Sequence, residues 1–562
     1  MTRRLHPIRA WALPETVPVA SGQAAAVEAA LDQALVRSVG ALPLVLPLCE
    51  RLGLREAVNR RCWPEGAGPE DIDVGRMALV LILNRLQAPQ PLVHIETWLA
   101  GTMLPELFGL DPAQCNDDRL ARTLDTLLPH LDAIWQDLVV AAITTFDLDL
   151  RYLCYDLTSL YFCGDYEEAD LVRYGYSRDH RPDRKQIEMA ATVTAAGGVP
   201  VDYRALAGNV ADRTTPVENL RRLQGLVAQL PPRDPAAPCV VVSDRAMLTD
   251  AALAAYARSD LCYLGPLDPG LGRGVVRDLL AAVSAEELAA HPLPYRPQRA
   301  ADNPDWVAYQ GVERPLLVPH PDPSRPPLEV RAVVVWSPGK ARLDAQMRAT
   351  HLGRLERALG QLAGKLGRRP YTTTTAVQAR VAALLKGHPA RPFLTVQVAG
   401  GPGAGTPLTL TWTRDEARLA EVAALDGRYV LGTNASDLDA AQMLERSKQR
   451  DVPEKRFALV KGPLAVRPVY VHKEDRVRGL VFCTMVAVLL FALLELVTRR
   501  AGLTLSGQQV LAQCATLTVV LLILHDGSTL RHLTGLAPPV ARLLQMLGWP
   551  AADQYCYPGA LL

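Results

Sequence analysis

The chain has 562 residues, of which 49% are apolar and 21% are charged, a composition typical of a globular protein without long biased repeats. Its 60 Lys and Arg nearly balance its 59 Asp and Glu, so the charge excludes a globally basic surface, and a polyanion can bind only at local patches. The length predicts three or four domains, or one large domain with a long insertion.

The cysteines and the N-terminus indicate the cellular compartment. Ten cysteines occur without a Cys-x-x-Cys pair, so they are predicted to be reduced, mostly buried thiols of a cytoplasmic protein. The first residues, "MTRRLHPIRAWALPE", carry arginines but no apolar run of signal-peptide length. Both features favour a cytoplasmic location.

Two windows of the chain are locally basic. Residues 340–369 hold eight Lys or Arg against two acidic residues, and residues 446–478 hold ten against four, so each window has a net charge of +6. Such charge runs most often form a solvated face, but they also suit the phosphates of a nucleic acid. The sequence leaves both interpretations open.

The first 148 residues are predicted to form a helical N-terminal domain. Apolar residues recur at spacings of three and four through "ALPLVLPLCERLGLREAV", "GRMALVLILNRL" and "RLARTLDTLLPHLDAIWQDLVVAAI", with no alternation of the strand type. A module of this kind could bind DNA ends, dimerise or cap the next domain, and the sequence does not separate these roles.

Residues 149–264 change to the pattern of a mixed α/β sheet. "RYLCYDLTSLYF" alternates and is rich in aromatic residues, and "KQIEMAATVTAAGGVPVDYRALAG" reads as two strands joined at Gly197 and Gly198. An amphipathic helix ("PVENLRRLQGLVAQL"), a short buried strand ("CVVVSDRAM") and another helix follow. Hairpin-linked strands followed by alternating helix and strand predict one mixed sheet.

Residues 265–420 are predicted to be a β-rich insertion that interrupts this sheet. The segment is rich in proline, contains the basic helix "KARLDAQMRATHLGRLERALGQLAGKLG" and ends in glycine-rich strand signals. Residues 421–500 then return to the sheet with "DGRYVLGTN", followed by a helix that starts near Ser436. Residues 501–562 are predicted to be a small C-terminal region with a strand in "LTVVLLILHDG".

The segment 480–497, "LVFCTMVAVLLFALLELV", is nearly long enough to span a bilayer. It contains Glu495 and occurs once, which favours a helix buried inside a large domain. A membrane protein built on this segment is the competing interpretation.

Two aspartates stand at unusual places in the predicted sheet. Asp156 lies in the middle of an otherwise apolar strand, where an unpaired carboxylate is costly to bury. Asp244 lies at the C-terminal end of another apolar strand, where it could also simply cap the next helix. Two carboxylates on adjacent strands can bind divalent cations, and a third from a crossing helix would complete a two-metal site for phosphoryl transfer.

Six motifs occur in a fixed order: "YDLTSLYF", "YGYSRDHRPDRKQ", "GVPVDYRALAGN", "VVVSDRAM", "LDGRYVLGTN" and "EKRFALVKGPLAVRPVYVHKEDRVRGLVF". Together they resemble the bacterial insertion-sequence transposases of the Asp-Asp-Glu class, in the branch whose catalytic glutamate lies in a Tyr-2-Arg-3-Glu-6-Lys signature. The resemblance covers about residues 110–500. It implies a ribonuclease-H-like catalytic domain with a β-rich insertion between the second and third acidic residues.

The resemblance also implies the residues of the site. Asp156, Asp244 and Glu454 would be the three catalytic carboxylates and would hold two Mg²⁺ ions, with Mn²⁺ able to substitute. Arg450 and Lys461 would contact DNA phosphates. The implied reaction cuts transposon ends and joins them to target DNA, carried out by a homodimer on double-stranded DNA with no membrane partner.

Two positions differ from the signature. Ser447 stands where the tyrosine would fall, and Pro453 immediately precedes Glu454. In one continuous helix, Arg450, Glu454 and Lys461 would lie along one face, but Pro453 would remove a hydrogen bond at a cost of about 3 kcal/mol. Alternatively, one helix ends near Arg450 and a second begins near Pro453, with a start between Asp451 and Glu454 that resembles a capping box. These differences keep a second hypothesis open, in which the protein binds DNA but has lost catalysis.

Overall fold

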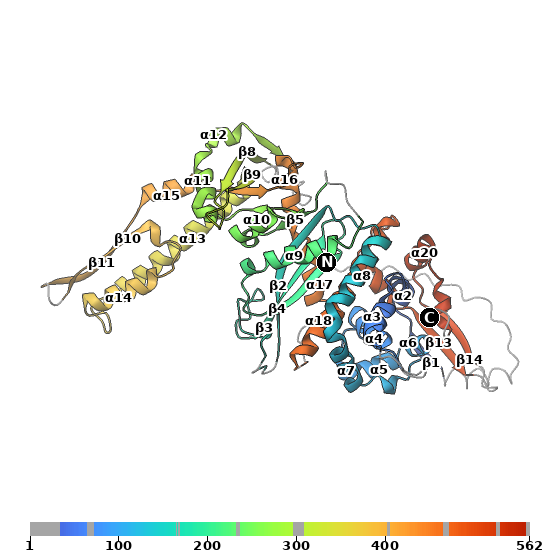
Figure 1. Ribbon diagram of the computed structural model, residues 1–562. Helices are drawn as coiled ribbons and strands as arrows, with labels where there is room; N and C mark the ends of the chain where they lie inside the picture. The colour runs from blue at the N-terminus through green and yellow to red at the C-terminus, as the bar shows by residue number, and fades with distance from the viewer. Residues whose placement is uncertain are drawn as a thin grey trace, which may run out of the picture. The chain divides into compact units, whose positions relative to one another are not determined.

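The computed structural model describes residues 34–63, 72–163, 166, 169–231, 237–295, 308–401, 405–464, 471, 473–523 and 529–557. The chain forms two compact units, which we describe separately (Figure 1). The first unit comprises residues 1–146, 162–169 and 458–562, and the second comprises residues 147–161 and 170–457. All ten cysteines are free thiols, and most of them are buried.

The first unit is mainly helical, as the apolar spacing predicts. Its helices are α2 (Leu42–Arg51), α3 (Leu54–Cys62), α4 (Val74–Gln87), α5 (Leu92–Ala100), α6 (Leu104–Phe108), α7 (Asp117–Leu127), α8 (Leu131–Thr145), α18 (Glu474–Arg500), α19 (Gly507–Cys514) and α20 (Pro538–Leu547). A small antiparallel sheet of β1 (Leu35–Ser38), β13 (Thr518–Ile523) and β14 (Thr529–Thr534) completes it, in the order β1-β13-β14. The strand β13 confirms the predicted C-terminal strand.

The strand β1 differs from the prediction that the first 148 residues are helical. It has four residues, too few for an alternating pattern to register, and it forms by pairing with β13, from Leu35 opposite Leu521 to Ser38 opposite Thr518. Residues 501–557 are therefore not a separate region, because they pair and pack with the N-terminal helices in one unit.

The apolar segment 480–497 forms most of α18, which lies in the core of the first unit. Among the described residues α18 is the one helix long and apolar enough to cross a membrane, and 89% of its most apolar window is buried inside the protein. Helices α2, α4 and α7 pack on it, and a Cβ built on Gly479 would lie 3.1 Å from the Cβ atom of Leu124 in α7. A core helix of a large domain passes the same length test, so this burial supports the interpretation favoured by Glu495.

The second unit is built on a nine-stranded mixed sheet (Figure 1). In spatial order its strands are β4 (Pro200–Ala207), β3 (Gln186–Thr194), β2 (Tyr152–Tyr161), β5 (Val240–Ser243), β6 (Cys262–Pro266), β12 (Arg428–Thr433), β9 (Leu328–Trp336), β8 (Ala308–Val318) and β7 (Pro292–Pro294). β2, β3 and β4 are antiparallel neighbours, whereas β5 and β6 run parallel to β2. The predicted strands of residues 149–264 and their turn at Gly197 and Gly198 are confirmed.

The helices of the second unit connect these strands. They are α9 (Pro216–Val227), α10 (Asp250–Tyr256), α11 (Val275–Ala282), α12 (Ala285–Ala289), α13 (Pro338–Ala363), α14 (Thr374–Leu385), α15 (Glu416–Ala423) and α16 (Ala440–Lys448), together with α17 (Val452–Lys461) up to Phe457. α9 and α10 follow β4 and β5 and occupy the segments in which the sequence predicts helices.

The segment 265–420 differs from the predicted insertion that interrupts the sheet. Its strands β8 and β9 continue the main sheet, because β9 pairs along its length with β12, as in Val334 opposite Val430. The run Val333–Val335 is completely buried, which is typical of a strand inside a sheet. In the described part of this segment, α13, α14, α15 and the hairpin of β10 (Leu394–Gly401) and β11 (Thr406–Arg414) build a separate small core.

Helices α16 and α17 lie next to each other in the chain around Glu454, and hydrogen bonds at the N-terminus of α16 fix where it begins. α16 does not start at Ser436: the Asp439 carboxylate accepts a hydrogen bond from the Gln442 amide (2.7 Å), and Gln442 Oε1 accepts one from the Asp439 amide (2.9 Å). This capping box sets the first turn three residues later than predicted. Of the two alternatives at Pro453, the structure has the helix break, since a 3-10 turn (Gln449–Asp451) separates α16 from α17 and Pro453 lies in the first turn of α17.

Candidate active site

Asp156 lies on β2, and Asp244 follows directly after the neighbouring parallel strand β5. β2 and β5 pair in register from Tyr152 opposite Val240 to Tyr155 opposite Ser243. Asp156 is the next residue of β2, and Asp244 directly follows the last residue of β5, so the register brings the two residues to the same end of β5. The sequence predicts each aspartate at a notable position, but only this register brings the two together.

Burial and nearby charges shift the pKa of the Asp156 carboxyl group. Burial raises the pKa of Asp156 to about 7, and the negative charges of Asp244 and Glu454 raise it as well. Two features oppose them: the Leu157 amide donates to Asp156 Oδ1 at 2.7 Å, and the positive charge of Arg178 favours the ionised form. The three predicted carboxylates therefore share one electrostatic environment.

Asp244 forms an ion pair with Arg450, one of the predicted DNA-binding residues. Arg450 lies in the 3-10 turn before α17, and its Nη1 atom is 3.0 Å from Asp244 Oδ1. Arg450 is therefore placed against a carboxylate that the sequence analysis assigns to metal binding.

Glu454 is exposed on the first turn of α17, and a buried arginine holds that helix in place. Arg456 Nε donates to the Gly198 carbonyl (2.8 Å) and Arg456 Nη2 donates to the Gly197 carbonyl (2.5 Å), in the turn between β3 and β4. A Cβ on Gly198 would lie 2.8 Å from Arg456 Nε, and Gly198 has φ +62°, so glycine is required at this close approach. Arg456 thus ties α17, the helix that carries Glu454, to the turn between β3 and β4.

Arg178 is a residue that the sequence analysis missed. Its Nη2 atom donates to both oxygens of Asp212 (2.6 and 2.7 Å), its Nη1 atom donates to the buried Glu188, and its amide donates to Ser159 Oγ (3.1 Å). Ser159 lies three residues after Asp156 on β2, so this network fixes a positive charge near that carboxylate. In the sequence, Arg178 stands out only as a residue of the motif "YGYSRDHRPDRKQ", and that position does not indicate a role.

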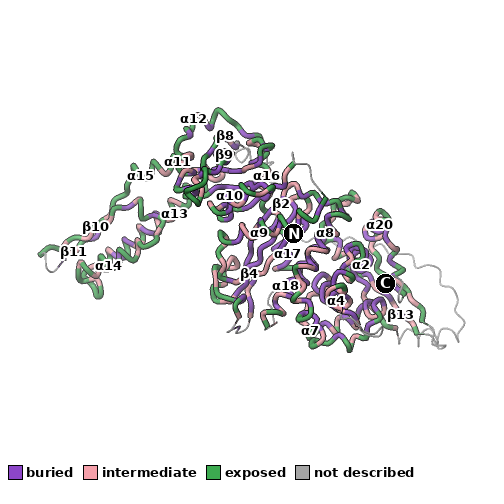
Figure 2. Tube along the Cα trace, viewed as in Figure 1, coloured by how far each residue is buried: buried purple, intermediate pink, exposed green. Residues whose placement is uncertain are grey.

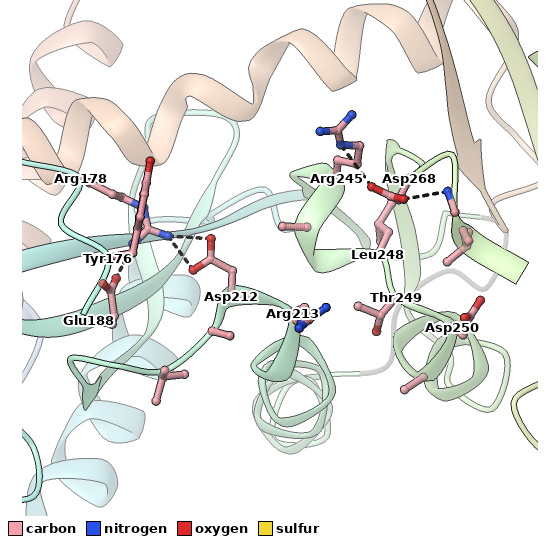
Figure 3. A pocket seen from close by; sticks show the side chains of 16 residues that line it. Tyr176, Arg178, Glu188, Asp212, Arg213, Arg245, Leu248, Thr249, Asp250 and Asp268 are labelled. Carbon is pink, nitrogen blue, oxygen red and sulfur yellow. Dashed lines mark hydrogen bonds and ion pairs between the residues drawn. The ribbon is translucent and has the colours of Figure 1, made fainter. Parts of the chain in front are cut away.

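A pocket of about 810 Å³ adjoins these residues (Figure 3). Arg178, Glu188 and Asp212 line one part of it, and Figure 3 shows Arg245 and Asp268 on another, 3.6 Å apart as an ion pair. The 3-10 turn that begins with Arg245 starts directly after Asp244. Charged groups of both signs therefore line this pocket, whereas Asp156, Asp244 and Glu454 are not among the residues that line it.

The two remaining signature positions have different surroundings. Ser447, at the tyrosine position, is 4% exposed, so it faces the protein interior. Lys461 is the last residue of α17, seven positions after Glu454, and belongs to the first compact unit.

The carboxylates fit a divalent cation by their chemistry. Asp156, Asp244 and Glu454 offer the hard oxygen ligands that Mg²⁺ prefers, and the burial of Asp156 beside two further negative charges is relieved by a bound cation. Among the residues that the structure describes, however, no three His, Cys, Asp or Glu side chains are already grouped closely enough to hold one ion. Binding would require these side chains to draw together, and the ion pair of Asp244 with Arg450 is one contact that would change.

Comparisons with known proteins give limited matches. Residues 34–139 match a family described as a domain of unknown function, DUF4277. No curated protein sequence matches the chain. Among solved structures, the chain is similar to a piggyBac transposase synaptic complex with hairpin DNA, at 8% identity and a TM-score of 0.36, over 85% of this chain and 78% of that one.

Proposed function

We propose that the protein is a cytoplasmic DNA transposase of the Asp-Asp-Glu class, which cuts the ends of a mobile element and joins them to target DNA. The observation that carries this proposal is the shared electrostatic environment of Asp156, Asp244 and Glu454. These residues come from β2, from the end of β5 and from α17, far apart in the sequence. The family resemblance selects the same three positions from motifs alone.

The sheet of the second unit supports a ribonuclease-H-like catalytic domain. Three antiparallel strands, β4, β3 and β2, are followed by β5 and β6 parallel to β2, and Asp156 lies on the central strand of these five. This is the kind of mixed sheet that the resemblance implies.

The side chains suit phosphoryl transfer. Asp156, Asp244 and Glu454 would hold two Mg²⁺ ions, which supply the Lewis acidity that makes water and a freed 3′-hydroxyl nucleophilic. Arg178 favours the ionised form of Asp156, and Arg456 keeps Glu454 in position. Arg450 and Lys461 would contact phosphates of the DNA, in a homodimer assembled on two element ends.

The proposal is tested by strand cleavage with the full chain. Labelled duplexes taken from the DNA on either side of the reading frame are incubated with Mg²⁺. Asp156→Asn and Asp244→Asn are expected to lower cleavage about 100-fold or more, as the loss of other transition-state charge stabilisers does, and to leave duplex binding intact. Asp260→Asn, an exposed aspartate outside the site, serves as the matched control. Wild-type cleavage by Asp156→Asn would overturn the assignment.

A DNA-binding protein that no longer cuts is the second proposed function. The pairing of Asp244 with Arg450 and the lack of a preformed three-ligand group among the described residues favour it. Wild-type protein with Mg²⁺ or Mn²⁺ and the same duplexes separates the two proposals. Strand cutting excludes the second, and binding without cutting in either metal supports it.

A further inference from the structure

The helical pair α13 and α14 carries a dense group of exposed positive charges. We name it the α13–α14 cationic surface, and it consists of Arg354, Arg357, Lys365, Arg368, Arg369, Arg380, Lys386 and Arg391. All eight residues are exposed, and Figure 2 shows exposed stretches along both helices. Between residues 349 and 401 there are these eight Lys and Arg and a single acidic residue, Glu356, a net charge of +7.

These charges are left without carboxylate partners. Glu356 is already paired with Arg414 of β11, with Nε–Oε1 and Nη2–Oε2 distances of 2.7 and 2.8 Å. In the described part of the chain, no Asp or Glu forms an ion pair with any of the eight residues of the α13–α14 cationic surface, and Arg357 donates instead to the carbonyl of Gly353. By contrast, Arg348, earlier on α13, is paired with Asp426, with Nη2 2.6 Å from Oδ2.

The fold beneath the surface is independent of these charges. On α13 the buried leucines Leu352, Leu355, Leu359 and Leu362 form one face and pack with Val377 and Val381 of α14 and with the β10–β11 hairpin. At 100° per residue, Arg354 and Arg357 lie on the opposite face of α13. The cations can therefore be replaced without opening the core.

The absence of exposed apolar side chains distinguishes between two polyanions. A helix that binds a membrane surface needs an apolar face to insert among the lipids. In residues 350–401, all of which are described, no large hydrophobic side chain is exposed; the exposed Leu343 and Met347 precede this segment on α13. Unpaired cations without apolar neighbours instead fit the phosphate backbone of a nucleic acid.

We propose that the α13–α14 cationic surface binds the phosphate backbone of double-stranded DNA without reading its sequence. The proposal rests on the proposed function, in which DNA is the substrate, and it places a DNA contact on a surface separate from the three carboxylates. Charges in this arrangement displace counterions from DNA, so the affinity depends steeply on salt, with a slope of about 0.9 for each phosphate contacted.

The test compares two charge-matched variants of the full chain. The surface variant combines Lys365→Gln, Arg368→Gln, Arg369→Gln and Lys386→Gln. The control variant combines Arg221→Gln, Arg258→Gln, Arg277→Gln and Arg325→Gln, which remove four exposed cations elsewhere in the second unit. Binding to a labelled 40-bp duplex of arbitrary sequence is measured by fluorescence anisotropy in EDTA from 50 to 300 mM KCl, and thermal unfolding checks that both variants fold.

The surface variant is expected to bind about 10-fold or more weakly than wild type at 100 mM KCl, with a salt slope smaller by about 3, whereas the control variant stays within about 3-fold of wild type. Equal effects of the two variants, or no effect of the surface variant, would overturn the proposal. So would a surface variant that loses binding to phosphatidylserine vesicles but keeps binding to the duplex.

Cleavage of element-end duplexes in Mg²⁺ is measured separately. Binding that depends on the surface, without any cleavage, would leave this inference standing and count against a transposase. Cleavage by a protein whose DNA binding does not depend on the surface would support the transposase and contradict this inference.

Discussion

The guanidinium of Arg450 and the carboxylate of Asp244 form an ion pair, with Nη1 3.0 Å from Oδ1. The Arg450 side chain is 44% exposed and that of Asp244 is 57% exposed, so solvent screens the pair and its contribution to folding is small. Its main effect is electrostatic: it places a positive charge on one of the carboxylates to which we assign metal binding.

We therefore expect Arg450→Gln to tighten divalent-cation binding to the metal-free protein. Removing the positive charge beside Asp244 lowers the repulsion that an incoming cation meets, and stability should change by less than about 0.5 kcal/mol. Titration calorimetry with Mn²⁺ would show a Kd several-fold lower than that of wild type. Arg325→Gln, which removes a similar exposed partner of Asp322, is the control. An unchanged or higher Kd for Arg450→Gln would contradict this role.

Stability should depend on pH through Asp156. Its pKa is about 7 in the folded protein against an ordinary value of 3.8, so the folded state holds this proton more tightly than the unfolded state. The folded protein therefore loses stability as pH rises from about 4 through about 7. Asparagine does not ionise, so Asp156→Asn should raise the free energy of unfolding at pH 8, on the order of 2 kcal/mol, and change it much less at pH 4.

Urea unfolding in EDTA at the two pH values measures this difference. Asp260→Asn, which removes an exposed carboxylate outside the site, is the matched control. A gain for Asp156→Asn that is equal at pH 4 and pH 8 would rule out titration of Asp156 as its source.

Replacing Arg456 should destabilise the second unit and impair cleavage together. Arg456→Met removes the donors to the Gly197 and Gly198 carbonyls, and leaving buried polar groups without partners costs about 1–3 kcal/mol. Glu454 is then held less firmly, so cleavage should fall by more than the folded fraction does. Lys455→Met, at an exposed neighbour paired with Asp451, should change stability by less than about 0.5 kcal/mol. Urea unfolding and the cleavage assay give the two readouts.

Restoring the signature tyrosine should harm the protein. Ser447 is almost completely buried, and forcing a large ring into a packed interior costs about 1–3 kcal/mol. Ser447→Tyr is therefore expected to lower the thermal midpoint and to give no tighter DNA binding, whereas Glu445→Tyr, at an exposed position on the same helix, should be nearly neutral. A Ser447→Tyr protein as stable as wild type and tighter on DNA would show that this position faces the substrate.

The buried helix α18 predicts the behaviour of the protein on cell lysis. Leu490 is completely buried, so Leu490→Ala should destabilise the first unit by about 2–5 kcal/mol in thermal or urea unfolding without detergent. The wild-type protein should remain in the supernatant after high-speed centrifugation. Recovery of wild type in the membrane pellet would favour the competing interpretation of a membrane span.

The differences between prediction and structure have one physical origin. Ser436 and Asp439 are both residues that cap helices, and the choice between them depends on the reciprocal bonds of Asp439 with Gln442. The four residues of β1 become a strand only because β13 pairs with them. Likewise, β7, β8 and β9 belong to the main sheet because β9 pairs with β12. Local patterns do not contain the identity of such partners.

The sequence by itself determined strands β2 to β5 of the mixed sheet and the two aspartates that stand out there, because hydrophobic periodicity and a charge inside an apolar run are local properties. Its motifs also indicated Glu454. Only the tertiary structure decided that Asp156 lies beside Asp244, that Arg450 pairs with Asp244 and that Arg456 anchors α17. Those contacts join segments far apart in the chain, and strand register and long-range packing decide which segments meet.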